Sequence, residues 1–228
     1  MNNQDCQIAH HEEHHSHSLY HELICHTPYA IFSVAVGFVV LSILSIFSYM
    51  PGQPNLVVRA GHMLFHNFHY LHIVFAATGA ILTFFRYSKN IIKGVIVGAV
   101  SSVFFCILSD ILMPYLAGRI LGVAMHFHVC FITEWYNIVP FLLVGVINGF
   151  LLSQHEPEKH GSYSLSSHFA HILVSSLASL FYIVSHGLAE WELYMGPLFM
   201  LMILAVVIPC TLSDVVVPMY FANARVEK

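Results

Sequence analysis

Charge is scarce in this sequence. Lys, Arg, Asp and Glu make up 9% of the 228 residues, whereas hydrophobic residues make up 57%. Soluble globular domains carry about 25% charged residues. The shortage of charge and the mean hydropathy of +0.74 therefore exclude an ordinary soluble domain and indicate an integral membrane protein.

Basic residues are especially few. The chain has eight Lys and Arg, which form no cluster, and a net charge of −4 when the histidines are neutral. Nucleic acids and anionic lipid headgroups attract basic patches, so neither is an expected partner. The first 28 residues contain no Lys, no Arg and no apolar core. We therefore expect no cleavable signal peptide, and the first membrane helix should direct insertion.

Long apolar runs take the place of charge. A helix needs about 20 residues to cross the hydrocarbon core of a bilayer. Six stretches reach this length: residues 29–50, 63–85, 91–117, 129–152, 166–187 and 196–221. Because only short connections separate them, the sequence predicts an all-α integral membrane protein with six transmembrane helices surrounded by membrane lipid.

The few basic residues predict the orientation of these helices. If the N-terminus is cytoplasmic, only Arg59 and Arg119 lie in outside loops. The inside segments then hold Arg86, Lys89, Lys93, Lys159, Arg225 and Lys228. This bias follows the positive-inside rule. We therefore expect both termini in the cytoplasm, in a multi-pass protein of a bacterial inner membrane.

The two halves of the chain resemble each other. CILSDILMP (Cys106–Pro114) matches CTLSDVVVP (Cys210–Pro218) at Cys, Leu, Ser, Asp and Pro. HYLHIVFAATGA (His69–Ala80) matches HFAHILVSSLAS (His168–Ser179) in its HxxHI pattern. Chance similarity between apolar helices rarely includes an aspartate. The sequence therefore predicts two copies of a three-helix unit.

An odd number of helices in each unit means that the second copy enters the membrane from the opposite side. Such inverted repeats are common in secondary transporters, whose substrate sites lie near the midplane. A weaker match between segments that begin at His26 and Glu134 extends the repeat to the first helix of each unit. The predicted parts are a His-rich cytoplasmic tail (1–27), the first repeat (28–120), the second repeat (121–153 and 164–222, with a loop at 154–163) and a short tail (223–228).

Three acidic residues, Asp110, Glu134 and Asp214, lie inside predicted helices. An ionisable group in a membrane is costly and by default marks function. No Lys or Arg lies in the helices around them, so protonation, a histidine or a bound cation must compensate their charge. Pro114 and Pro218 follow the aspartates by four residues and lack an amide, so the aspartate carbonyls should lose their helical partners.

Histidine spacing favours a bound cation. Four histidines of the second helix follow one another at steps of four, three and three residues, which keeps them within an arc of about 120°. They are His62, His66, His69 and His72. His168 and His171 repeat the last pair in the fifth helix. Two imidazoles one turn apart can hold one metal ion, which a carboxylate or thiolate from a neighbouring helix completes.

Helix direction divides the candidate ligands into two sites. With the N-terminus inside, the outer site comprises His69, His72, Asp110 and Glu134. The inner site comprises His26, His168, His171 and Asp214. Cys106 and Cys210 each precede an aspartate by four residues and share its helix face, so they are candidate thiolate ligands. His126 and His128 could feed the outer site.

The ligand types restrict the ion. Imidazole with carboxylate suits zinc, iron(II), manganese, cobalt or nickel, whereas calcium and magnesium prefer oxygen shells. We therefore expect a permease or channel for a divalent transition-metal ion, with zinc or iron foremost, acting alone or as a homo-oligomer. The His-rich tract from His10 to His26 could concentrate ions at the cytoplasmic mouth or form a disordered tail.

Two other functions remain open. The same residues could form the di-iron, copper or haem centre of a membrane metalloenzyme, and His186 with His69 or His72 is the haem-ligand pair to test. Otherwise we expect His186 to form a hydrogen bond between helices. Alternatively, Asp110, Asp214 and the histidines could relay protons that drive another substrate. Ligands in both halves, and the lack of a soluble catalytic domain, favour a transporter over an enzyme.

Overall fold

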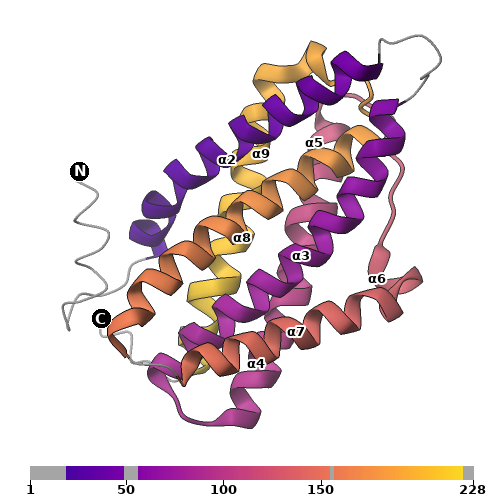
Figure 1. The fold of residues 1–228 in the computed structure, drawn as a ribbon. Coiled ribbons are helices and arrows are strands. Elements are labelled where there is room, and N and C mark those ends of the chain that lie inside the picture. The colour runs from indigo at the N-terminus through magenta and orange to yellow at the C-terminus, as the bar shows by residue number, and fades with distance from the viewer. Residues whose placement is uncertain (1–18, 49–55, 155–156, 223–228) are drawn as a thin grey trace.

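The computed structural model describes residues 19–48, 56–154 and 157–222 (Figure 1). Its long unbroken helices are α2 (Leu19–Ser48), α3 (Leu56–Tyr87), α7 (Trp135–Ser153) and α8 (Pro157–Ser185). Two more consist of three pieces each: α4 (Ile91–Ile107), η1 (Leu108–Leu112) and α5 (Met113–Ile120), then α9 (Met195–Thr211), η3 (Leu212–Val216) and α10 (Val217–Phe221). The short helices α6 (Cys130–Thr133) and η2 (Trp191–Tyr194) precede α7 and α9. The described ranges contain no β-strand.

Six helical segments are long and apolar enough to cross a membrane. They are Leu23–Ser48, Leu56–Tyr87, Ile91–Ile120, Trp135–Ser153, His168–Ser185 and Trp191–Phe221. Each overlaps one of the apolar runs found in the sequence. The prediction of an all-α, multi-pass membrane protein with six membrane helices is therefore confirmed.

Two predicted boundaries differ from the structure. Residues 154–163, predicted as a loop, include the start of α8, which begins at Pro157. A proline suits the first turn of a helix because the amide N–H that it lacks would have no partner within the helix there. Helix α2 begins at Leu19, inside the predicted tail, and the rest of that tail, residues 1–18, lies outside the described residues.

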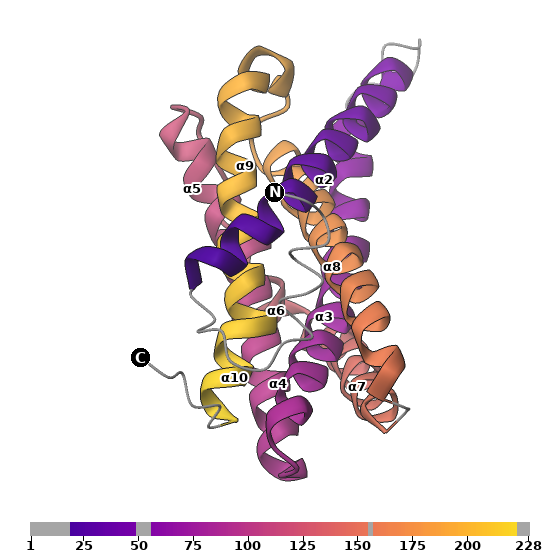
Figure 2. The ribbon, with the colours of Figure 1, turned by 90° about the vertical axis from the view of Figure 1, so that its left-hand side faces the viewer.

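Helix α3 is the hub of the bundle. It packs against α2, α4, α7 and α8, and Figure 2 shows α2, α3 and α8 slanting past the more upright α9 and α10. Two of these neighbours meet it through glycines four residues apart, Gly94 and Gly98 on α4 and Gly145 and Gly149 on α7. A methyl group at Gly145 would lie 2.7 Å from a backbone oxygen of α3. Small residues therefore let these helices approach closely.

A π-helical turn interrupts each broken helix at the repeated LSD motif. In η1 the amide of Met113 donates to the carbonyl of Leu108, five residues back, and Pro114 follows at once. The turn η3 repeats this pattern before Pro218. A proline disrupts the regular helical ladder, and a wider turn accommodates the disruption. The same motif thus produces the same local structure in both halves and places both aspartates inside it.

Candidate metal centre

The histidines of α3 form a ladder from the surface into the core. His62 is exposed, and His66 retains 12% exposure of its side chain. His69 and His72, one and two turns deeper, are buried. Burying an imidazole is costly unless it has a hydrogen-bond partner. The two deeper rings therefore need polar groups from other helices.

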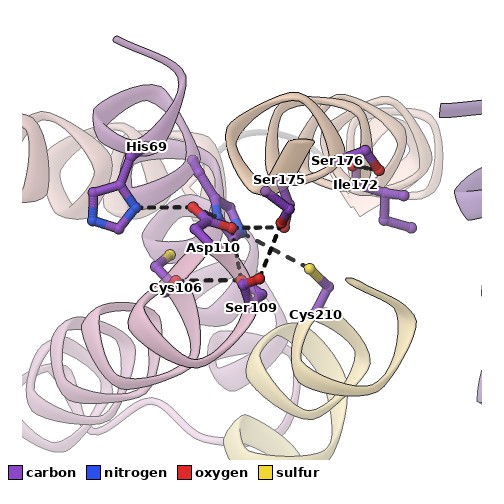
Figure 3. Close-up of polar contacts among 10 residues, drawn as sticks. His69, Cys106, Ser109, Asp110, Ile172, Ser175, Ser176 and Cys210 are labelled. Atoms are coloured by element: carbon purple, nitrogen blue, oxygen red, sulfur yellow. Dashed lines mark hydrogen bonds and ion pairs between the residues drawn. The ribbon is translucent and has the colours of Figure 1, made fainter. Parts of the chain in front are cut away.

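Asp110 in η1 provides those partners. The Nδ1 atoms of His69 and His72 donate to the same carboxylate oxygen, Oδ2, at 2.9 and 2.7 Å. The other oxygen, Oδ1, accepts from the hydroxyls of Ser109 and Ser175 at 2.8 and 2.9 Å (Figure 3). Ser175 belongs to α8, so the second half of the chain completes this cluster. Each oxygen of the buried carboxylate thus accepts two hydrogen bonds.

Asp214 in η3 forms a second cluster of the same type. Its Oδ2 accepts from His171 Nδ1 at 2.5 Å and lies 3.1 Å from His168 Nδ1. Its Oδ1 and the Ser213 hydroxyl are buried with no hydrogen-bond partner in the part of the chain that the structure describes. Gly79 of α3 covers the carboxylate so closely that a methyl group there would lie 2.8 Å from Oδ2.

The aspartates determine the tautomer of these histidines. A ring whose Nδ1–H donates to a carboxylate keeps its lone pair on Nε2. The Nε2 atoms of His69 and His171 are buried without a hydrogen-bond partner among the described residues. Metal-binding histidines usually have a carboxylate behind them in this way, which orients the ring and raises its basicity. The geometry thus suits the Nε2 atoms as ligands and the aspartates as their supports.

The two clusters meet near the middle of α3 and α8. The rings of His72 and His171 have their centroids 4.5 Å apart. The sulfur of Cys210, on α9, lies 3.9 Å from His72 Nε2. Ligand atoms of all three buried residues lie within 4.8 Å of one another. We call His72, His171 and Cys210 the central group.

The central group has nearly the spacing of a metal shell. Bonds of about 2.0–2.3 Å from a tetrahedral zinc ion to nitrogen and sulfur place the ligands roughly 3.3–3.8 Å apart. The separation of 3.9 Å between Cys210 and His72 is close to that range. Small side-chain rotations would therefore be enough to close the group around one ion.

A second group of ligands lies at the end of the bundle where α3 begins. Ligand atoms of His66, His128 and Cys130 lie within 4.8 Å of one another. We call these three residues the mouth group. Glu134 Oε1 lies 3.2 Å from His66 Nε2, and the carboxylate also accepts a hydrogen bond from the Tyr70 hydroxyl.

Titratable groups near the mouth have shifted pKa values. Burial acts to raise the pKa of Glu134, but the hydrogen bond from Tyr70 and the nearby His66 outweigh it and hold that pKa below its ordinary value. Burial and the Glu134 charge raise the pKa of Cys130 to about 12. Burial lowers the pKa of His186 to about 4. At neutral pH these groups are therefore a carboxylate, a thiol and a neutral imidazole.

Two further histidines, on α8 and α2, extend the series of imidazoles from the central group toward the end of the bundle opposite the mouth group. His168 lies one turn from His171 on α8 and retains 12% exposure of its side chain. The ring of His26, on α2, lies edge-on to His168 with centroids 5.3 Å apart. The described histidines and aspartates thus extend in series from the mouth group to His26.

Several sequence-predicted residues lie apart from the two ligand groups. Cys106 is buried close to Asp110 (Figure 3) but does not belong to the central group. Glu134 is close to His66 rather than to His69. His126 is exposed, and His186, which follows the end of α8, donates from Nδ1 to the carbonyl of Tyr182 at 2.9 Å.

Two residues of these clusters escaped the sequence analysis. Ser175 looks like an ordinary small residue, and only the packing of α8 on η1 brings it to Asp110. Cys130 follows His128 by two residues in an HxC pattern. In an extended segment this spacing places both side chains on one face, so the pattern was a usable signal.

Comparisons with protein-family models, with curated proteins and with solved structures give no match.

Proposed function

We propose that the protein is a membrane permease for a divalent transition-metal ion, which binds the central group on its way across. The supporting observation is the series of imidazoles and carboxylates that runs through the bundle and has the central group at its middle. His72, His171 and Cys210 at its centre are buried, whereas His66 and His168 on either side each retain 12% exposure of their side chains. A purely structural network would not need the Nε2 atoms of His69 and His171, which make no hydrogen bond to any described residue.

The ligands of the central group favour zinc or iron(II) among the transition metals. Imidazole binds both ions, and a thiolate favours zinc over manganese. No oxygen of Asp110 or Asp214 needs to enter the shell, because the carboxylates already hold the rings from behind. The negative charge that they contribute would nevertheless stabilise a dication at membrane depth.

The repeated motifs support an inverted repeat as the basis of movement. Each half contributes one HxxH helix and one π-turn aspartate, and His72 and His171 come from equivalent positions of the two halves. The central group is buried, so we propose that the two halves rock against each other to expose it alternately. With both termini in the cytoplasm, the mouth group faces outside.

A metalloenzyme is the second candidate, because a carboxylate behind a histidine also supports catalytic metals. Of the di-iron, copper and haem centres that such an enzyme could contain, haem fits the arrangement of the histidines least. Two histidines that ligate one haem lie on opposite faces of the macrocycle, each bonded to the iron, whereas the rings of His72 and His171 lie with centroids 4.5 Å apart. The pair expected from the sequence was His186 with His69 or His72, and the ring of His186 instead stacks on Tyr182 with centroids 4.1 Å apart.

Uptake by reconstituted protein tests the proposal. Zinc, iron(II) and manganese uptake into liposomes should be saturable and should exceed that of protein-free vesicles. His72→Ala and His171→Ala should each lower uptake by more than about tenfold, since even outer-shell changes act on that scale. His126→Ala is the matched control because that imidazole is exposed and lies outside the central group.

Each outcome distinguishes the candidates. If His72→Ala and His171→Ala both retain metal uptake, the central group is not the transport site. Protein that retains tightly bound metal but transports none would favour the metalloenzyme. Monodisperse elution and an unchanged thermal transition for each variant would show that lost uptake does not come from unfolding.

A further inference from the structure

The mouth group is built from segments that its surroundings hold in place. His66 belongs to α3, whereas His128 and Cys130 come from the extended stretch before α6 and from α6 itself. The amide of His128 donates to the Tyr182 hydroxyl of α8 at 3.1 Å. The amide of His126 donates to the carbonyl of His186 at 2.8 Å. Hydrogen bonds thus fix the stretch that carries His128 to α8 and to the residue after it, and His128 lies close to His66 of α3.

Local backbone geometry brings His128 and Cys130 to the same side. The intervening Val129 has φ −118° and ψ 103°, which is an extended conformation. Side chains two residues apart in an extended segment point the same way. The thiol of Cys130 is buried and free, and ligand atoms of both residues lie within 4.8 Å of one on His66.

Among the described residues, two imidazole nitrogens of the mouth group make no hydrogen bond, whereas His66 Nδ1 donates to the carbonyl of His62 at 2.8 Å. The Nε2 atoms of His66 and His128 are buried and make no hydrogen bond within the described ranges. Glu134 lies 3.2 Å from His66 Nε2, but without the alignment of a hydrogen bond. A buried polar atom that is left without a partner is destabilising. We infer that His66, His128 and Cys130 form a second metal site, which binds a borderline cation such as zinc or cobalt(II).

The chemistry of the mouth group selects this class of cation. Two imidazoles and a thiolate suit zinc and cobalt(II), and disfavour magnesium and calcium, which take oxygen shells. Binding would release the Cys130 proton to solvent. The thiolate and the neighbouring Glu134 carboxylate would then balance the two positive charges of the ion.

The role of this site rests on the proposed function, but its existence does not. In a permease, the mouth group is the first station of the path, and the exposed His62, whose ring lies 4.6 Å from that of His66, leads to it from the surface. A site with a thiolate at the mouth would then discriminate against manganese before the ion reaches the centre.

Cobalt(II) titration of the purified full-length protein tests the site. The titration starts from the double variant Cys106→Ser, Cys210→Ser, which removes the other two free thiols of the described residues. A cobalt–thiolate charge-transfer band should appear in this variant and disappear when Cys130→Ser is added. His128→Gln in the same background should weaken cobalt binding by about tenfold or more. His126→Gln, two residues away and exposed, should leave the band and the affinity unchanged.

The outcomes separate this inference from the transport proposal. A band that survives Cys130→Ser in this background, or that never appears in the double variant, would overturn the mouth site, even if liposomes take up metal. A Cys130-dependent band in protein that transports no metal would keep the mouth site and overturn the permease. Elution and thermal unfolding like those of the parent are required of each variant, and His128→Gln gives a second readout if Cys130→Ser fails that requirement.

Discussion

In each half of the molecule, an aspartate in a π-helical turn faces two histidines one turn apart on a neighbouring helix. The two clusters differ in the second carboxylate oxygen. Asp110 Oδ1 accepts from Ser109 and Ser175, whereas Asp214 Oδ1 is buried without a partner among the described residues. The same motif thus produces one saturated carboxylate and one with an oxygen still free to accept.

This difference assigns the clusters different mechanical roles. Ser175 reaches from α8 to Asp110 and links the two halves of the chain. Four hydrogen bonds make Asp110 a fixed anchor, because releasing it would leave several buried groups unsatisfied. Asp214 can accept a further proton donor, water or ion without breaking an existing bond. If the protein is the proposed permease, we therefore expect its rearrangements to take place mainly around Asp214.

Removing each carboxylate in turn should give the largest loss of stability and tests directly whether the two clusters differ. Asp110→Ala should lower the free energy of unfolding by about 3–5 kcal/mol, because it strips partners from two buried histidines and two serines. Asp214→Ala should cost about 1–3 kcal/mol less, since it deprives only the histidines and removes an unsatisfied oxygen. Unfolding in mixed micelles measures both values, and equal losses would contradict the asymmetry.

Crowding the Asp214 carboxylate should have the next largest effect. Gly79→Ala would place a methyl group 2.8 Å from Asp214 Oδ2, and the two histidines limit how far the carboxylate can move. We expect a loss of about 1–3 kcal/mol, typical of overpacking, together with weaker zinc binding in calorimetry. Gly196→Ala is the matched control, because a methyl group there meets nothing within 4 Å. Equal behaviour of the two variants would show that Asp214 yields easily.

Two adjacent serines of α8 test the hydrogen bond to Asp110 through smaller changes in stability. Ser175→Ala removes a donor from Asp110 and should cost about 1.5–3 kcal/mol, the usual worth of a hydrogen bond to a charged group. Ser176 is also buried, but its hydroxyl donates to the Ile172 carbonyl of its own helix (Figure 3). Ser176→Ala should therefore cost less than about 1 kcal/mol. Unfolding titrations that rank the two variants in the opposite order would refute the cross-link.

The serines next to the aspartates should give the smallest effects. Ser109→Ala removes a donor to Asp110 Oδ1 and should destabilise the protein by about 1.5 kcal/mol, the low end for a hydrogen bond to a charged group. Ser213→Ala removes a buried hydroxyl that has no partner in the described part of the chain. It should be neutral or slightly stabilising, by up to about 1 kcal/mol. A thermal shift assay on both variants is the measurement, and a clear loss for Ser213→Ala would reveal a partner.

The number and type of the membrane helices could be predicted because hydropathy is a local property. Helix α8 begins at Pro157, inside the segment 154–163 that was predicted as a loop, for a reason that is also local. Residues from Pro157 onward are polar, and polarity alone does not distinguish a loop from a helix end outside the bilayer. The glycine pairs that let α4 and α7 approach α3 were visible in the sequence as GxxxG spacing, but their contact partner was not.

The candidate ligands were largely predictable as residue types, and their grouping was not. HxxH spacing predicted that His69 and His72 share a face, and the repeated motif predicted Asp110 as an intramembrane acid. In the structure, one oxygen of Asp110 accepts hydrogen bonds from both rings, and this contact depends on how η1 packs on α3. The HxC pattern could have paired Cys130 with His128, but only the packing of α3 brings His66 beside them.

The sequence by itself determined six apolar helices, a duplicated motif with a π-turn before each proline, and rows of histidines on single helix faces. These features follow from interactions within one or two turns of chain. Only the tertiary structure decided that His72 and Cys210, 138 residues apart, become neighbours, and that a serine of α8 completes one aspartate but not the other. Such contacts depend on which helix faces pack together, and that choice belongs to the whole bundle rather than to any segment of it.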